Sequence, residues 1–284
     1  MNSDVIRRLV FDGLAEHSLA LVLTALGESG IIVAPIKGVV LARWLYAHVS
    51  ERPYVDVDLL VPRASFANAV RVVAARGWPV YYHSAEMGEL SFFVDQVATE
   101  IHAEVARLDL SRLSSAEVLA RGRADRTTFP FEVLRIDDID HFFILVANVV
   151  KDGFTYAKAH VPADLDRMLR RLTGQYDAII ARARSAALLT ALHNTTIWMA
   201  EEHASEEFKA FASRLGPPRR RTFAATVRWY RQRSVRHPSR LSSSSGLVGV
   251  ALATLTPDER GLQLRGLARL IRRGAIRKLG RDPG

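Results

Sequence analysis

Two aspartates one residue apart, Asp56 and Asp58, lie in an apolar run that reads as a β-strand. Successive side chains of a strand point to opposite faces, so residues i and i+2 share one face with Cα atoms roughly 6–7 Å apart. Aspartate is depleted in strands, and a strand with two on one face departs from its own propensity. Because such a pair can hold one or two divalent cations, the spacing predicts a metal site.

The Asp-x-Asp spacing is not specific by itself, because residues 138–140 and 164–166 repeat it. Each of these two pairs begins an apolar helical pattern, where aspartate accepts hydrogen bonds from unpaired backbone N–H groups and complements the positive end of the helix. Asp56 and Asp58 precede no helix. For them the competing interpretation is exposure on an edge strand.

A Lys37-Gly38 pair lies 19 residues before Asp56, between a short apolar strand and an amphipathic helix. Glycine lets the backbone approach a ligand closely, the helix N-terminus offers N–H donors, and lysine adds a positive charge. The junction therefore predicts a phosphate-binding turn.

A third element is the alternating segment Thr99-Glu100-Ile101-His102. Alternation puts Glu100 and His102 on one strand face, and a carboxylate from a neighbouring strand would complete an oxygen-ligand site suited to magnesium. The alternative is the polar outer face of an amphipathic strand. His102 has no second histidine at metal-ligand spacing, so no zinc site is expected.

Together these residues resemble the uncharacterised bacterial nucleotidyltransferase-like family of the polymerase β superfamily. The resemblance rests on Lys37-Gly38, Arg52, the Asp56-to-Val61 run and Glu100-Ile101-His102. It spans roughly residues 30–185 and leaves the C-terminal segment uncovered.

The resemblance implies transfer of a nucleoside monophosphate from a nucleoside triphosphate, such as ATP, to an acceptor hydroxyl or phosphate. It implies Mg²⁺, two ions about 3.5–4 Å apart, held by Asp56, Asp58 and Glu100. Glu100 would hold the acceptor-side ion and serve as the base.

The same resemblance assigns the nucleotide contacts. Lys37 and the Gly38 amide would contact the β and γ phosphates, and Arg52 would either contact phosphate or steady the carboxylates. Further candidates from the helical part of the chain are Lys151, Lys158 and Asp164.

The hydrophobic pattern changes its period near residue 136. Helices are expected over 4–29, 39–48 and 65–76, with strands over 31–36, 54–61, 80–83, 90–94 and 98–108. Only helices are expected afterwards, over 140–150, 162–172, 176–184, 186–202 and 223–233. The sequence thus predicts an α+β fold: a mixed-sheet catalytic module over 1–136 and an all-helical domain over 137–284 that ends in a basic tail.

The chain has a net charge of +9, and this charge is unevenly distributed along the sequence. From Phe208 onward the chain carries 18 Lys and Arg against 3 acidic residues, and before it 21 against 27. The resemblance leaves the acceptor open between a small molecule and an RNA or tRNA end, as in toxin-like relatives, and a basic region, which attracts polyanions, slightly favours the RNA. The other interpretation of the charge is a solvated arginine-rich surface, and the rival function is a non-catalytic nucleotide- or nucleic-acid-binding protein.

Composition excludes several classes of protein. The 284 residues are 49% hydrophobic and 24% charged, and cysteine is absent, so disulfides and thiolate metal sites do not exist. The sequence shows no uninterrupted apolar stretch near the 18 residues that a membrane span needs. A cytoplasmic protein with no membrane partner is expected, and the pattern leaves the oligomeric state open.

Overall fold

The computed structural model describes residues 3–105, 111–151, 160–218, 220–236, 252 and 255–268. The chain divides into two compact units, which are described separately below. The sheet unit comprises Met1–Val105 and Leu113–His141, and the helical unit comprises Ala106–Arg112 and Phe142–Gly284.

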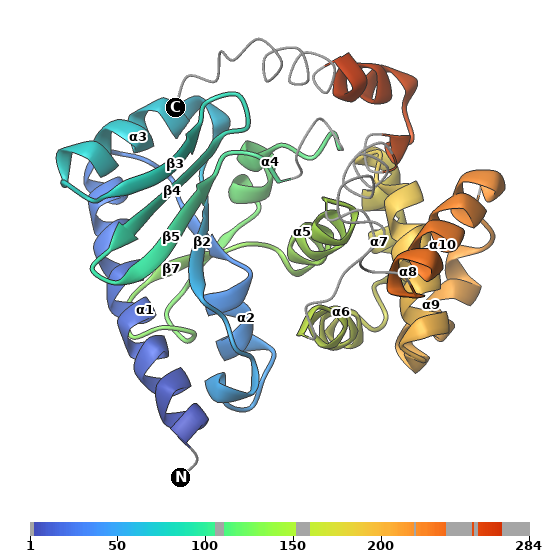
Figure 1. The fold of residues 1–284 in the computed structure, drawn as a ribbon, viewed down its shortest axis with the longest axis horizontal. Helices are drawn as coiled ribbons and strands as arrows, with labels where there is room; N and C mark the ends of the chain where they lie inside the picture. Colours follow the sequence, from blue (N-terminus) through green and yellow to red (C-terminus); the bar gives the residue numbers. More distant parts are fainter. Residues whose placement is uncertain are drawn as a thin grey trace. The chain divides into compact units, whose positions relative to one another are not determined.

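A five-stranded mixed sheet forms the centre of the sheet unit (Figure 1). The strands of this sheet are β1 (Ala34–Ile36), β2 (Asp56–Leu60), β3 (Val80–Ser84), β4 (Glu89–Val94) and β5 (Val97–His102). Their order is β1-β2-β5-β4-β3, and all neighbours are antiparallel except the β2–β5 pair, which is parallel. The β2–β5 register sets Asp58 opposite Glu100, so two of the predicted carboxylates lie side by side.

The remaining elements of the sheet unit are helices, short 3₁₀ turns and a small hairpin. They are α1 (Ser3–Glu28), α2 (Gly38–Trp44), η1 (Val49–Glu51), η2 (Arg63–Ser65), α3 (Phe66–Ala75), α4 (Ser115–Ala120), β6 (Arg123–Asp125), β7 (Val133–Arg135) and the start of α5 (Asp138–Lys151). The helix expected over 39–48 ends earlier, at Trp44, and the strand expected over 98–108 ends at His102.

Alternation along the strands separates a core face from a polar face. Helices α1 and α3 cover the core face (Figure 1), where residues of both helices pack against every second residue of β2, β4 and β5. This core includes Leu19, Phe66, Val57, Phe92 and Ile101. Because core residues alternate with site residues, burial of the apolar set fixes Asp56, Asp58, Glu100 and His102 on the opposite face.

Helix α1 bears on the expectation that no segment of the chain spans a membrane. Its 26 residues are long and apolar enough, by length and composition, to cross a membrane, with a mean hydropathy of 1.5 over the best 18-residue window. A third of that window is buried in the structure, and Leu19, Val22 and Leu26 belong to the core. A core helix of a soluble unit passes the same test, so the helix is weak evidence for a membrane span.

The helical unit contains the rest of α5, the five helices named next and a helical segment over residues 260–268. The five helices are α6 (His160–Arg171), α7 (Tyr176–Ser185), α8 (Leu189–Glu202), α9 (Glu206–Leu215) and α10 (Arg221–Arg236). The sequence pattern located all of them except α9, which begins at a Ser205 cap. With a mixed sheet followed by helices, the predicted α+β class is confirmed.

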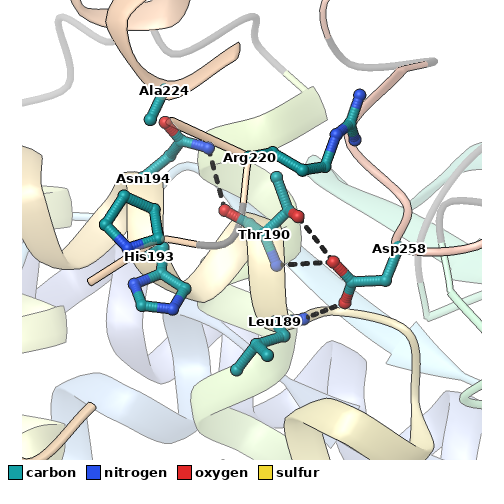
Figure 2. A pocket seen from close by; sticks show the side chains of 8 residues that line it. Leu189, Thr190, His193, Asn194, Arg220, Ala224 and Asp258 are labelled. Carbon is teal, nitrogen blue, oxygen red and sulfur yellow. Dashed lines mark hydrogen bonds between the residues drawn. The ribbon is translucent and has the colours of Figure 1, made fainter. Parts of the chain in front are cut away.

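The segment after residue 255 folds against the start of α8. The Asp258 carboxylate accepts hydrogen bonds from the backbone N–H groups of Leu189 and Thr190, at 2.6 and 3.0 Å, and from the Thr190 hydroxyl (Figure 2). Two orphan N–H groups of the helix are thereby satisfied by a residue about 70 positions away. The cavity beside this cap is about 10 Å³, the space of one water molecule, so it cannot take a nucleotide.

Candidate active site

Strands β2 and β5 bring three side chains of the polar face together. Asp58 Oδ1 lies 2.7 Å from His102 Nε2, and His102 Nε2 lies 3.4 Å from Glu100 Oε2. The ligand atoms of Asp58, Glu100 and His102 all lie within 4.8 Å of one another. Asp58 and His102 are buried, and Glu100 is half-buried.

Lys37 extends into the same cluster from the turn between β1 and α2. Its Nζ donates to Asp58 Oδ1 at 2.9 Å and lies 3.4 Å from His102 Nε2. The Lys37 ammonium thus places a positive charge inside the cluster that contains the Asp58 and Glu100 carboxylates. The sequence placed Lys37 near phosphate, whereas the structure shows it paired with a carboxylate.

Charge coupling inside the cluster is strong. Burial alone would lower the pKa of Lys37, but the Asp58 carboxylate, with Glu100 and Asp56 adding to it, outweighs burial and raises that pKa. Burial alone would raise the pKa of Asp58, but the Lys37 ammonium and the hydrogen bond from His102 hold it well below its ordinary value. The hydrogen bond with His102 also lowers the pKa of Glu100. Both carboxylates are therefore ionised at neutral pH.

A buried histidine positions the Lys37 backbone. The Lys37 N–H donates to His141 Nε2 at 3.2 Å, and Lys37 itself has φ 55° and ψ −125°, in the left-handed half of backbone space that residues other than glycine rarely adopt. Such strain costs about 1–3 kcal/mol and persists where the surroundings enforce it. His141 belongs to the first turns of α5, so this hydrogen bond links the turn to α5.

Burial keeps His141 neutral. Its side chain is fully buried, and burial together with the nearby charges of Arg135, Arg52 and Lys37 lowers its pKa to about 3. Neutral Nε2 accepts from the Lys37 N–H, so the proton lies on Nδ1, which has no hydrogen-bond partner among the described residues.

Gly38 is required by close packing at the same turn. A Cβ at this position would lie 2.9 Å from the Tyr54 Cβ and 3.1 Å from Arg52 Nη1. Arg52 is 5% exposed. Arg52 therefore packs beside the turn, in agreement with either of the two roles predicted for it.

Tyr54 ties this turn to α1. Its hydroxyl donates to Asp12 Oδ1 at 2.5 Å, and Arg43 of α2 pairs with Asp12 and Glu16. Burial, strengthened by the hydrogen bond with Asp12, raises the pKa of Tyr54 far above its ordinary value, so the phenol stays a donor. The network fixes α2, and with it Lys37, against the body of the unit.

The remaining predicted residues lie in three places. Asp56 shares the polar face of β2, is half-buried, and its charge helps to raise the pKa of Lys37. Lys151, at the end of α5, and Asp164, buried in α6, belong to the helical unit, and Lys158 lies outside the described residues. The roles predicted for all four stay predictions.

Two histidines were not assigned from the sequence. His102 was set aside because it has no histidine partner, yet the parallel β2–β5 register, which no local pattern reveals, brings it to Asp58. His141 lies in an apolar helical pattern and 104 residues from its partner Lys37. The signal for His102 was the acid-x-His alternation, and the sequence offered none for His141.

The donor set fits a divalent cation. Asp58 and Glu100 present hard carboxylate oxygens suited to magnesium or manganese, and the His102 imidazole adds a nitrogen donor. Ligation by His102 Nε2 would require that atom to release the proton that it shares with Asp58 Oδ1. A cation would also compete with the Lys37 ammonium for the same carboxylate oxygen.

Residues 12–204 match the model of a family described as uncharacterised nucleotidyltransferases. The chain belongs to this family. The match covers both the phosphate-turn candidates and the carboxylate cluster, and it extends into the helical unit. The family predicted from Lys37-Gly38 and Asp56-x-Asp58 is confirmed, and the protein is a nucleotidyltransferase.

Solved structures show more distant similarity, and no curated protein matches the sequence. The antibiotic-resistance factor ANT(2'')-Ia is 13% identical, with 61% of this chain and 93% of that chain covered and a TM-score of 0.45. A tRNA nucleotidyltransferase complexed with a primer tRNA and an incoming ATP analogue is 13% identical, with 90% and 99% covered and a TM-score of 0.27. Because both TM-scores are below 0.5, neither similarity bears on the acceptor of this nucleotidyltransferase.

The helical unit of this nucleotidyltransferase has a basic groove of its own. The groove has a volume of about 330 Å³ and lies between α8 and α10. Its lining includes Arg221, Arg228 and the exposed Trp229 from α10, and Arg228 pairs with Glu201 of α8 at 3.1 Å. Arginine beside an exposed indole is a combination that single-stranded nucleic-acid sites use.

Proposed function

We propose that this nucleotidyltransferase moves a nucleoside monophosphate from a nucleoside triphosphate to the terminal hydroxyl of an RNA, in a Mg²⁺-dependent reaction. The observation that carries the proposal is the convergence of Asp58, Glu100 and His102, whose ligand atoms lie within 4.8 Å of one another, with Lys37 Nζ 2.9 Å from Asp58 Oδ1. The excess of positive charge after Phe208 and the groove at Trp229 support a polyanionic acceptor.

In the proposed reaction the acceptor oxygen forms a bond to the α-phosphorus, the bond to the pyrophosphate oxygen breaks, and the acceptor proton passes to Glu100. When bound, Mg²⁺ held by Asp58 and Glu100, with Asp56 as the third carboxylate, would neutralise phosphate charge and acidify the acceptor hydroxyl. The hydrogen bond with His102 lowers the pKa of Glu100, so Glu100 is ionised at neutral pH and is a weak proton acceptor.

Lys37 and Gly38 would bind the leaving phosphates. The Lys37 ammonium would exchange the Asp58 carboxylate for phosphate oxygens, and the Gly38 N–H, at the start of α2, would donate to them. His141 would keep the Lys37 N–H in its strained orientation throughout.

A labelled-triphosphate assay tests the proposal. Each of the four triphosphates, labelled in the α-phosphate, is incubated with the protein, Mg²⁺ and total RNA, and label in RNA is counted. Asp58→Asn should abolish transfer, whereas Asp177→Asn, which removes an exposed carboxylate of α7, should leave it unchanged. Equal transfer by wild type and Asp58→Asn would refute the metal-site proposal.

The rival function, triphosphate binding without turnover, has one observation in its favour. Lys37 and His102 already satisfy Asp58 Oδ1 without any metal ion. Tight triphosphate binding with no label transferred to RNA or to a metabolite pool would support the rival. Label in a small metabolite, with none in RNA, would keep the reaction and replace the acceptor.

A further inference from the structure

Two aromatic side chains are exposed on the polar face of the sheet. Tyr81 of β3 is 52% exposed and Phe93 of β4 is 38% exposed, and their ring centroids are 4.8 Å apart with planes tilted by 38°. The adjacent residue Phe92 is fully buried in the core on the other face. Exposed large aromatic rings carry a hydration cost, and Phe93 is not a member of the hydrophobic core formed by the described residues.

The aromatic pair shares its face with the catalytic candidates. Across the sheet Phe93 is opposite Ala98, which is opposite Asp56, and in the next row Ser91 is opposite Glu100, which is opposite Asp58. Two strand spacings separate β4 from β2, so Phe93 lies on the order of 10 Å from the aspartates. Ala98, which lies between Phe93 and Asp56 in this row, has a small side chain that does not obstruct the surface between these two residues.

The tyrosine lies next to the cluster. Its hydroxyl is near the side chain of the buried Ser91, the cross-strand neighbour of Glu100. Partial burial raises the pKa of Tyr81, and the charges of Glu100, Asp56 and Asp58 add to the shift, which shows that the carboxylates act on this ring.

The geometry of in-line displacement indicates on which side of the carboxylates the acceptor binds and on which side the leaving phosphates bind. The attacking oxygen and the leaving pyrophosphate must stand on opposite sides of the α-phosphorus. Lys37 and Gly38, the proposed contacts of the leaving phosphates, adjoin β1, which flanks β2 on one side. The β5, β4 and β3 strands flank it on the other side, so the acceptor should approach over Glu100, Phe93 and Tyr81.

We propose that Tyr81 and Phe93 form a shelf on which the terminal base of the acceptor RNA stacks, so that its ribose hydroxyl faces Glu100. The inference rests on the proposed function and names the part of the acceptor that the sheet unit recognises. The occupant is a nucleobase because the shelf offers two ring faces beside three carboxylates. A planar ring with a polar edge suits that surface, whereas an anionic group placed there would be repelled.

The test compares RNA ends with and without a terminal base. A fluorescently labelled single-stranded RNA and the same RNA with an abasic terminal nucleotide are titrated with the full chain, Mg²⁺ and a non-hydrolysable triphosphate analogue. Phe93→Ala and Tyr81→Ala should each weaken binding of the intact RNA roughly 5- to 150-fold, the range for loss of one base–aromatic stack. Neither variant should change binding of the abasic RNA or of the triphosphate.

Conservative variants guard against misfolding. Phe93→Trp and Tyr81→Phe keep a ring and should retain wild-type binding, and Phe93→Leu keeps apolar bulk and should lose it. Equal affinity of wild type and Phe93→Ala for the intact RNA would overturn the shelf, as would equal loss with the abasic RNA. The readout is binding, so a protein that binds RNA as expected and transfers no nucleotide would refute the proposed reaction and leave the shelf standing.

Discussion

Replacing Lys37 by methionine should move metal affinity and triphosphate transfer in opposite directions. In the structure the Lys37 ammonium occupies Asp58 Oδ1 at 2.9 Å, with side chains only 16% and 7% exposed. A cation must displace this ammonium before it can bind the same oxygen. Lys37→Met should therefore bind Mn²⁺, used as a reporter for Mg²⁺, more tightly, and should transfer nucleotide more slowly because the leaving phosphates lose a positive partner.

The expected magnitudes follow from the burial of the pair. Removal of one partner of a buried ion pair costs about 3–5 kcal/mol, and the remaining hydrogen bond from His102 to Asp58 favours the lower end. A loss of about 3 kcal/mol corresponds to a Tm lowered by roughly 6–12 °C in metal-free buffer. Removing a competitor of about that strength should tighten Mn²⁺ binding by up to roughly 150-fold.

The pH dependence follows from the two pKa shifts. Asp58 has a lowered pKa, so its stabilisation is present above its ordinary value of 3.8 and is lost as pH falls through the folded value. Lys37 has a raised pKa, so its stabilisation is present below 10.5 and is lost as pH rises through the folded value. The Tm difference between wild type and Lys37→Met should thus be largest between about pH 4 and pH 10, and it should decrease in stronger acid.

Differential scanning calorimetry and Mn²⁺ titration measure these effects. Lys209→Met is the matched control, because it removes an exposed lysine that pairs with Glu206. An exposed ion pair contributes at most about 1 kcal/mol to stability, so the Tm of this variant should change little. Unchanged or weaker Mn²⁺ binding by Lys37→Met, or an unchanged Tm without metal, would show that the ammonium does not compete for Asp58.

Three further outcomes are expected. Gly38→Ala should lower triphosphate affinity by about tenfold in calorimetric titration, because the new Cβ meets Tyr54 at 2.9 Å and must shift the turn; unchanged affinity would contradict the packing argument. His141→Leu should cost about 1–3 kcal/mol in chemical denaturation, because the buried Lys37 N–H loses its acceptor, and should lower kcat more than it raises KM for triphosphate; a wild-type kcat would rule out positioning. Arg228→Ala should weaken RNA binding and reduce the slope of log affinity against log salt by about 1, whereas an unchanged slope would exclude the α8–α10 groove.

The sequence by itself determined the local elements and the family. Strand alternation located β2 and β5, and Lys37-Gly38 with Asp56-x-Asp58 identified a nucleotidyltransferase before any contact was known. These features are local, because a side-chain period of two and a turn before a helix are written in adjacent residues. The same periodicity predicted the helices α5, α6, α7, α8 and α10, which are present among the described residues after 137.

Only the tertiary structure decided which residues meet. The parallel pairing of β2 with β5, across some 40 residues of chain, aligned Asp58 with Glu100 and brought in His102. The hydrogen bond from Lys37 to His141 spans 104 residues, and the crossed strand order placed Tyr81 and Phe93 on the face of the carboxylates. Strand register and burial are set by the packing of the whole sheet, so no pattern of neighbouring residues reveals these contacts.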